Sequence, residues 1–149
     1  MSDAGVVRLL LFRVGAVLCA AEAERVREIL PRLDTTRIPG APPPVAGLGN
    51  VRGTLVTVVD GWRALRQPEP PAAAVGGTTV LLEVGGGKKI LGFTVDEVVD
   101  LLSVGGETLE RRQALPGVDP IVVRAVGRRA GQLFVVLDTD ALLSPILSS

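Results

Sequence analysis

Three apolar segments recur in the same order in the two halves of the chain, and this internal repeat constrains the fold more than any other feature. The matching pairs are 10–15 with 80–85, 26–30 with 98–102, and 53–65 with 131–143. The last pair matches at a constant offset, from Gly53 with Gly131 to Leu65 with Leu143. Generic strand–turn–strand patterning is the alternative explanation, because single apolar matches arise by chance. Three matches in order favour a duplicated unit.

The repeated segments have the composition of β-strands. Two apolar runs, Val6–Val14 and Ala16–Ala21, flank a glycine turn and predict a hairpin. A second hairpin is predicted from Val45–Val51 and Leu55–Val59, around the turn Arg52-Gly53. Short strands at this spacing suit small barrels. We therefore predict a mainly β fold of two five-stranded barrels or half-barrels, SH3-like or OB-like, with short helices.

Helical elements are predicted to be few and short. Apolar residues recur at helical spacing within Glu22–Leu30, before Pro31, so an amphipathic helix is predicted there. Asp60 is expected to cap a short helix over Trp62–Leu65. A C-terminal helix is expected over residues 138–147.

The length fits one domain, residues 1–149, built from two subdomains. Subdomain 1 is placed at about 15–80, and subdomain 2 at about 81–137 together with the N-terminal strand. The segment Gln67–Gly77 is rich in proline, alanine and glycine, as in a connector between two packed halves.

Composition favours protein partners over catalysis. Lys and Arg number 16, as do Asp and Glu, so the chain lacks the net charge that gathers nucleic acid or anionic membrane. There is no histidine, the commonest general base and neutral metal ligand, and the single cysteine, Cys19, excludes a multi-cysteine zinc site. The run Val6–Val14 is too short and too charged for a membrane span or signal core. We predict a cytoplasmic non-enzyme without metal, cofactor or membrane insertion.

The segment Gly47–Asp60 resembles the signature of the CheW-like family, in which a glycine precedes Asn-x-Arg-Gly and a strand ending in Val-Asp. Flanking motifs have counterparts in order, so the resemblance covers roughly Val6–Leu143. It implies two five-stranded β-barrels on a shared core, in agreement with the repeat. It also implies a scaffold, located at receptor arrays, that binds the signalling tip of a chemoreceptor and the CheW-like regulatory domain of the chemotaxis histidine kinase.

The resemblance also implies a set of site residues. The partner-facing positions are Val26, Glu28, Gly47 and Arg52, and the turn-shaping positions are Asn50 and Gly53. Each has a simpler explanation, as a core valine, a solvated acid or a turn residue. In the repeat, Asp100 stands where Glu28 does, whereas Ala130 stands where Arg52 does. We therefore expect the arginine to be particular to the first half, which favours Arg52 as the functional residue.

Three other functions remain open at this point. Small residues such as Gly49 and Gly61 depart from the family pattern, as in an adaptor of a chemosensory pathway other than motility. A small barrel that binds nucleic acid would use stacked aromatic residues and a basic groove, but the chain has only four aromatic residues and no net charge, which argues against this function. An enzyme would rely on Asp60, Asp96 or Asp138, and the Gly85–Lys88 run lacks the spacing of a phosphate loop.

Overall fold

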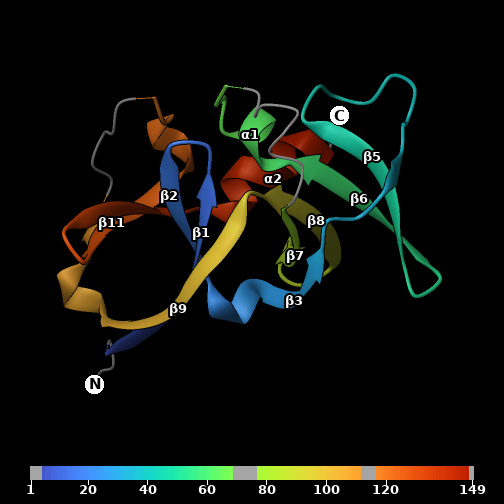
Figure 1. Cartoon of the computed structure of the whole chain (residues 1–149). Helices are drawn as coiled ribbons and strands as arrows, with labels where there is room; N and C mark the ends of the chain where they lie inside the picture. Colours follow the sequence, from blue (N-terminus) through green and yellow to red (C-terminus); the bar gives the residue numbers. More distant parts are fainter. Residues whose placement is uncertain (1–4, 69–76, 112–116, 148–149) are drawn as a thin grey trace.

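The computed structural model describes residues 5–68, 77–111 and 117–147, and these form two six-stranded sheets with short helices (Figure 1). The predicted mainly β class is confirmed. The first half contains β1 (Val6–Val14), β2 (Val17–Glu22), η1 (Ala23–Arg25), β3 (Val26–Pro31), β4 (Thr35–Thr36), β5 (Val45–Val51), β6 (Thr54–Asp60) and α1 (Gly61–Ala64). The second half contains β7 (Thr78–Val84), β8 (Lys89–Val95), β9 (Glu97–Gly105), η3 (Gly106–Thr108), β10 (Glu110–Arg111), η4 (Pro120–Val122), β11 (Val123–Arg129), β12 (Gln132–Leu137) and α2 (Thr139–Leu147).

The two halves exchange hairpins. Sheet A has the order β10-β11-β12-β2-β1-β9, and sheet B has the order β4-β5-β6-β8-β7-β3. Each sheet thus takes four strands from one half and a two-strand hairpin from the other, and each strand of one sheet has a counterpart at the same place in the other sheet. In Figure 1, β1, β2, β9 and β11 lie on the left and β3, β5, β6, β7 and β8 on the right. This strand order confirms the internal repeat.

Irregularities in the strand pairing repeat as well. The β3–β7 pairing skips Arg27, and the β9–β1 pairing skips Val99 at the matching position. The β5–β6 pairing skips Ala46, and the β11–β12 pairing skips Arg124. Each skipped residue is a β-bulge, which bends its strand and increases the local twist. The two halves therefore share their curvature as well as their topology.

The helix predicted over Glu22–Leu30 is wrong. Only Ala23–Arg25 is helical, as a single 3₁₀ turn, and β3 then pairs with β7 from Val26 onward. Burial alternates along β3, with Val26 and Leu30 on the partly buried face and Ile29 on the exposed face, so one apolar residue that faces solvent produces a spacing that resembles a helical repeat. Pairing with a buried strand, together with β-branched residues, decides the conformation.

The subdomain boundaries at about residues 80 and 81 remain a prediction, as does closure of the strands into two five-stranded barrels. Hydrogen bonding groups 26–60 with 78–95 in sheet B, and 6–22 with 97–137 in sheet A. Most of the predicted connector, residues 69–76, lies outside the described residues. The helix α2 falls within the predicted range 138–147.

Two aspartates precede the α-helices, and one of them caps its helix. The carboxylate of Asp138 accepts a hydrogen bond from the N–H of Ala141 at 3.0 Å, at the start of α2. Asp60 makes no side-chain cap bond with α1, and its Oδ2 lies 3.8 Å from Nε of Arg63. The prediction for Asp60 was therefore wrong, because a nearby guanidinium attracts the carboxylate instead.

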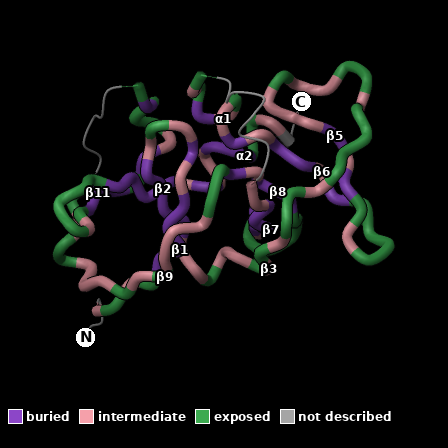
Figure 2. Tube along the Cα trace, viewed as in Figure 1, coloured by how far each residue is buried: buried purple, intermediate pink, exposed green. Residues whose placement is uncertain are grey.

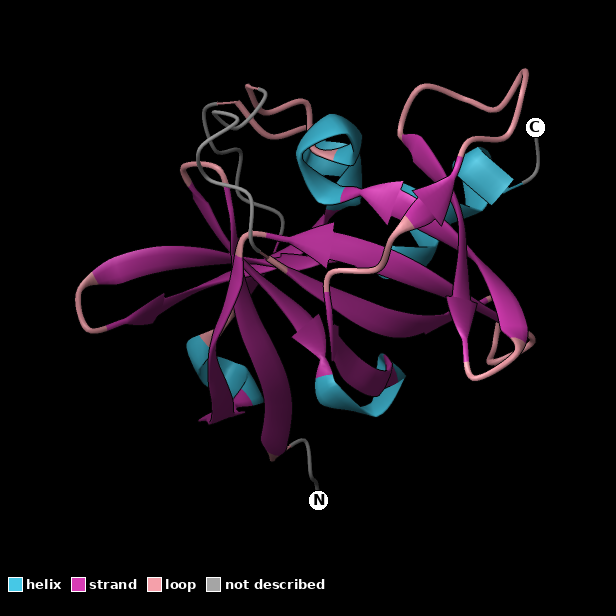
Figure 3. Cartoon of the chain, turned by 45° about the vertical axis from the view of Figure 1, so that its right-hand side comes forward, coloured by secondary structure: helices cyan, strands magenta, loops and turns pink. Residues whose placement is uncertain are grey.

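The main core lies between the two sheets. Phe12 of β1 and Phe93 of β8 meet edge to face with ring centroids 6.0 Å apart, and both are fully buried. Leu10 of β1 belongs to this cluster, whereas Leu9 and Leu11 pack into a second cluster inside sheet A. Both faces of β1 are thus buried, which explains its continuous apolar run. Buried segments concentrate where the sheets meet (Figure 2), and the helices lie at the margins of the strands (Figure 3).

Candidate functional site

The turn between β5 and β6 holds its arginine in an unusual backbone conformation. Its two loop residues both have positive φ, 49° for Arg52 and 88° for Gly53, as in a type I′ hairpin turn. The side-chain oxygen of Asn50 accepts a hydrogen bond from the N–H of Gly53 at 2.8 Å, which closes the turn. An L residue other than glycine is strained at such a φ. Asn50 and Gly53 therefore close a tight two-residue turn, and Arg52 stands at its tip.

Arg52 and Glu28 form a bidentate ion pair. Nη1 of Arg52 donates to Oε2 of Glu28 at 3.0 Å, and Nη2 donates to Oε1 at 2.5 Å. These hydrogen bonds lower the pKa of Glu28 from its ordinary value of 4.5; partial desolvation opposes them and the positive charge of Arg52 adds to them. The same bonds raise the pKa of Arg52. The Arg52 side chain is still 69% exposed, so its remaining N–H donors face solvent.

The ion pair joins parts of sheet B that are not neighbours. Glu28 lies on the edge strand β3, and the hairpin that carries Arg52 is separated from β3 by β7 and β8. A contact at 3.0 Å requires the sheet to curl until these two parts meet. The pair therefore fixes the position of an exposed guanidinium relative to the edge strand.

Gly47 and Val26, the other two predicted partner-facing residues, are more buried than Arg52. Gly47 is buried in β5 with a φ of 150°, and a Cβ atom there would overlap the carbonyl oxygen of Thr36 on β4. Its glycine is explained by this close approach of two strands. Val26, at the start of β3, is partly buried and packs against the main core. A direct contact of either residue with a partner remains a prediction.

The second half contains a counterpart pair that the sequence analysis missed. Nε of Arg129 donates to Oδ2 of Asp100 at 2.9 Å. Asp100 lies on the edge strand β9, at the position equivalent to Glu28, while Arg129 stands one residue before Ala130. The expectation that only the first half has the arginine was wrong, because residues were compared at a constant offset. The sequence did contain a signal for the pair, because Arg129 directly precedes Ala130.

Exposed aliphatic side chains also repeat. Ile29 on β3 and Leu101 on β9 occupy equivalent positions beside the two acids, and both are exposed. Leu55 on β6 and Leu133 on β12 are likewise equivalent and exposed. Apolar side chains held in water next to a charge pair suit contact with another macromolecule.

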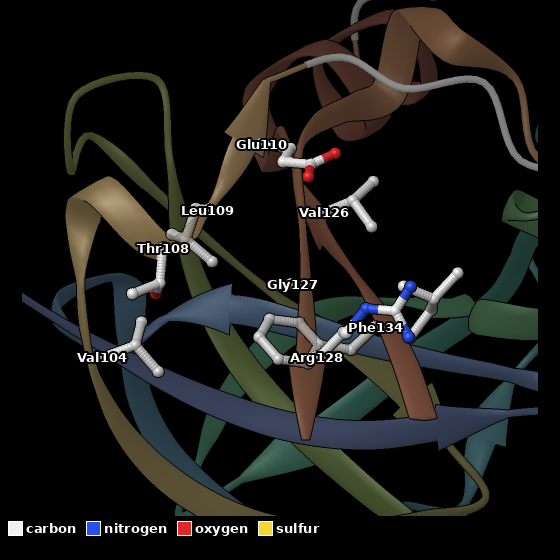
Figure 4. Close-up of a pocket in the computed structure, with 9 residues that line it drawn as sticks. Val104, Thr108, Leu109, Glu110, Val126, Gly127, Arg128 and Phe134 are labelled. Atoms are coloured by element: carbon white, nitrogen blue, oxygen red, sulfur yellow. The ribbon is translucent and has the colours of Figure 1, made fainter. Parts of the chain in front are cut away.

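A pocket of about 220 Å³ opens at the end of sheet A, between β9, η3, β10 and the β11–β12 hairpin (Figure 4). Its apolar lining includes Val104, Leu109 and Phe134, with Arg128 and Glu110 also among the lining residues. Gly127 leaves room for this arrangement, because a Cβ atom there would overlap the Phe134 ring. In the first half, the equivalent Gly49 lies beside smaller side chains.

The lone cysteine does not add chemistry to the site. Cys19 is fully buried in β2, and burial, with a smaller effect of the Asp96 charge, raises the pKa of its thiol to about 12. A thiol in this state is protonated and shielded at neutral pH. Cys19 is therefore a core residue.

These features define a β scaffold that carries an exposed charge pair and exposed aliphatic side chains. The CheW-like domain family matches residues 8–146, and the chain belongs to this family. Among the described residues, no helix is long and apolar enough to cross a membrane.

Curated relatives agree with this family. The chain is 26% identical to a chemotaxis protein CheW of Treponema pallidum, covering 92% of this chain and 82% of the relative. It is 24% identical to a chemotaxis protein CheW of Bacillus subtilis, covering 91% and 86%. The fold matches the scaffolding protein TtCheW of Thermoanaerobacter tengcongensis with a TM-score of 0.81, at 18% identity and 91% coverage of both chains. Together these similarities support a chemotaxis scaffold.

Proposed function

We propose that this chain couples chemoreceptors to their histidine kinase, at cytoplasmic receptor arrays, and does so without chemistry of its own. The observation that carries the proposal is the exposed guanidinium of Arg52, which Glu28 holds in place across the curl of sheet B. An arginine fixed in this way offers directed hydrogen bonds to a partner at little further entropic cost. A scaffold needs such a fixed contact more than it needs a reactive group.

The receptor side of the proposal is the surface around Glu28 and Arg52. A receptor signalling tip is helical, and a helix docks on apolar side chains flanked by polar anchors. Ile29 and Leu55 are exposed close in sequence to the two charged residues, and Leu55 is 65% exposed. Val26 contributes the more buried part of the same strand. Gly47 acts indirectly, by keeping β4 close to β5.

The kinase side of the proposal is the pocket at the end of sheet A (Figure 4). In the family, the kinase regulatory domain has the same fold and meets the scaffold end to end. Leu133 is exposed and lines this pocket together with the buried Phe134. An exposed leucine at an apolar pocket is suited to a matching apolar end of a partner.

Variants of the ion pair test the receptor side. Arg52→Gly removes the guanidinium and relieves the positive φ, and Arg52→Asn keeps a residue type that tolerates this φ. Both are expected to stay folded and to bind the receptor signalling domain at least about tenfold more weakly in co-sedimentation, from loss of a charge-assisted contact. Ala130→Gly is the matched control, because it relieves the equivalent turn in the second half without removing a charge. Unchanged binding by both Arg52 variants would overturn the assignment.

A pocket variant tests the kinase side. Leu133→Asp places a charge on an exposed side chain of the pocket and leaves the core intact. We expect loss of binding to the kinase regulatory domain with receptor binding retained, measured by calorimetry with each partner domain separately. Wild-type protein that binds neither domain at tens of micromolar would refute the coupling proposal, since weak scaffolding contacts lie at or below this range.

Nucleic-acid binding receives less support than coupling. Of the two basic residues Arg128 and Arg129, the second is committed to Asp100. Asp100 offsets the positive charge of Arg129, whose side chain is only 34% exposed, so it attracts a phosphate weakly. A salt-dependent shift of a single-stranded oligonucleotide by wild-type protein, absent in Arg128→Ala, would instead favour this function.

A further inference from the structure

A groove of about 330 Å³ is lined by residues of α1, η4 and α2. Residues of both halves line it, and neither Glu28 nor Arg52 is among them. The receptor and kinase surfaces described above therefore do not account for this groove.

The floor and one wall of the groove are apolar. Leu65 at the end of α1 and Leu142 of α2 are buried beneath it, and Ile146 lines it further along α2. Ile121 of η4 is 68% exposed at its rim. When a partner covers an apolar side chain that is this exposed, the free energy of the complex falls, because apolar surface leaves water.

Arg66 is the second unusual feature of the groove. The N–H of Gln67 donates to the carbonyl oxygen of Trp62 at 2.7 Å, and the N–H of Arg66 donates to that of Arg63 at 3.1 Å. This is the Schellman pattern of a helix C-terminus, and the residue at the position of Arg66 usually is glycine. Arg66 has a φ of 55°, which disfavours an L side chain. Backbone geometry alone therefore gives no reason for an arginine here.

The only other arginine with positive φ among the described residues is Arg52, whose exposed guanidinium carries the proposed function. Within the described part of the chain, the Arg66 side chain makes no hydrogen bond or ion pair, and the residue is exposed. A strained backbone position that presents an exposed charge is the kind of outlier that indicates binding.

The charges that line the groove are unequal. Arg63 is held in place, with its guanidinium 4.8 Å from the Trp62 ring and Nη1 donating to the carbonyl oxygen of Pro43 at 3.1 Å. The one lining acid, Asp119, uses its carboxylate to accept the N–H of Ile121 at 3.0 Å. Nε of Arg63 also lies 3.8 Å from Oδ2 of Asp60, so its charge is offset. Arg66 is therefore the lining cation without a charged partner among the described residues, and beside the apolar wall it is complementary to a carboxylate on an aliphatic segment.

We propose that the groove between α1, η4 and α2 binds an acidic, aliphatic peptide segment of a partner protein. Arg66 binds a carboxylate of the segment, and an aliphatic side chain covers Ile121 and Ile146. This gives the scaffold a third surface, independent of receptor and kinase binding.

The test uses the full chain and one defined probe, an acetylated and amidated decapeptide of alternating aspartate and leucine. We expect the peptide to shift the methyl NMR signals of Ile121 and Ile146 and the Nε–H signal of Arg66, and to lose affinity as salt rises. The same peptide with lysine in place of aspartate should cause no such shifts. No shift at about 1 mM peptide, a weak-binding limit, would overturn the proposal.

Two variants separate binding from folding. Arg66→Gly suits the backbone better and should unfold at a higher denaturant concentration, yet bind the peptide at least about tenfold more weakly. Ala130→Gly gives the same backbone relief outside the groove and should bind like wild type. Equal binding by Arg66→Gly and wild type would overturn the proposal. Shifts of Ile121 and Ile146 that depend on protein concentration without peptide would also overturn it, because a second copy would then occupy the groove.

Discussion

The two halves of this protein solve the same structural problem with differently placed arginines. Both join an acid on an edge strand to a two-residue hairpin across the curl of a sheet. In the first half Arg52 stands in the turn itself, makes a bidentate pair and is 69% exposed. In the second half Arg129 stands on the strand, makes one hydrogen bond and is 34% exposed. Each half therefore has a charge pair between an edge strand and a hairpin, but the arginine side chain is more exposed in the first half than in the second.

The difference teaches how a duplicated fold separates structure from function. Ala130 adopts a φ of 50° in the second half, nearly that of Arg52, although it carries no functional group. The backbone of the turn is therefore inherited by both halves. The turn does not require an arginine, because Ala130 adopts the same backbone, and the arginine in the first turn exposes a cation at the cost of backbone strain.

The largest effect that would test this comparison is expected at Gly47. A Cβ atom there would overlap the backbone of Thr36, and the φ of 150° is unfavourable for alanine. Gly47→Ala should lower the free energy of unfolding by about 2–4 kcal/mol, measured by urea denaturation. Its counterpart is already an alanine, Ala125, and Ala125→Gly should cost only about 1 kcal/mol. If Gly47→Ala and Ala125→Gly cost the same, β4 does not approach β5 as closely at Gly47 as described.

A second glycine pair reverses the asymmetry. A Cβ atom at Gly127 would overlap the Phe134 ring, whereas one at Gly49 would lie 3.1 Å from Cγ2 of Val58. Gly127→Ala should cost about 1–3 kcal/mol by overpacking, and should also change the pocket of Figure 4. Gly49→Ala should change stability by less than about 1 kcal/mol, since a small shift of Val58 offsets the gain in strand propensity. Thermal unfolding of both variants against wild type measures the contrast.

The two turns offer a smaller, opposite effect. Ala130→Gly should raise the free energy of unfolding by about 1 kcal/mol, because glycine adopts positive φ without a steric penalty. Arg52→Gly should gain less, because it also removes the pair with Glu28. A larger gain for Arg52→Gly than for Ala130→Gly would show that the first ion pair does not stabilise the fold. Guanidinium denaturation resolves the pair when both variants have the wild-type m-value.

The smallest expected effect is a pH dependence at the first ion pair. Because the pKa of Glu28 is lowered in the folded state, its contribution is present above about pH 4.5 and is lost as pH falls through the folded pKa. Wild type and Glu28→Gln should therefore differ in stability at pH 7 and converge as the pH falls below the folded pKa of Glu28. NMR titration of the Glu28 carboxyl should give a pKa below 4.5 that returns toward this value in Arg52→Ala. A pKa that stays low in Arg52→Ala would assign the shift to another group.

The sequence predicted strands correctly where an apolar run is followed by a turn that contains glycine. Val45–Val51 and the turn at Arg52-Gly53 lie where they were predicted, because a two-residue loop with positive φ favours glycine. The prediction failed on Glu22–Leu30, where Ile29, an apolar residue on the exposed face of β3, imitated a helical period. It also missed Arg129, since a constant offset cannot show which neighbouring side chain reaches across a curled sheet.

The sequence by itself determined the β class, the duplicated order of strands and the turn that carries Arg52, because periodicity and glycine placement are local properties of the chain. Only the tertiary structure decided that the halves exchange hairpins, and that Glu28 meets Arg52 while Asp100 meets Arg129. These contacts join strands far apart in sequence. Their geometry depends on how far each sheet curls, which bulges and packing between the sheets set together.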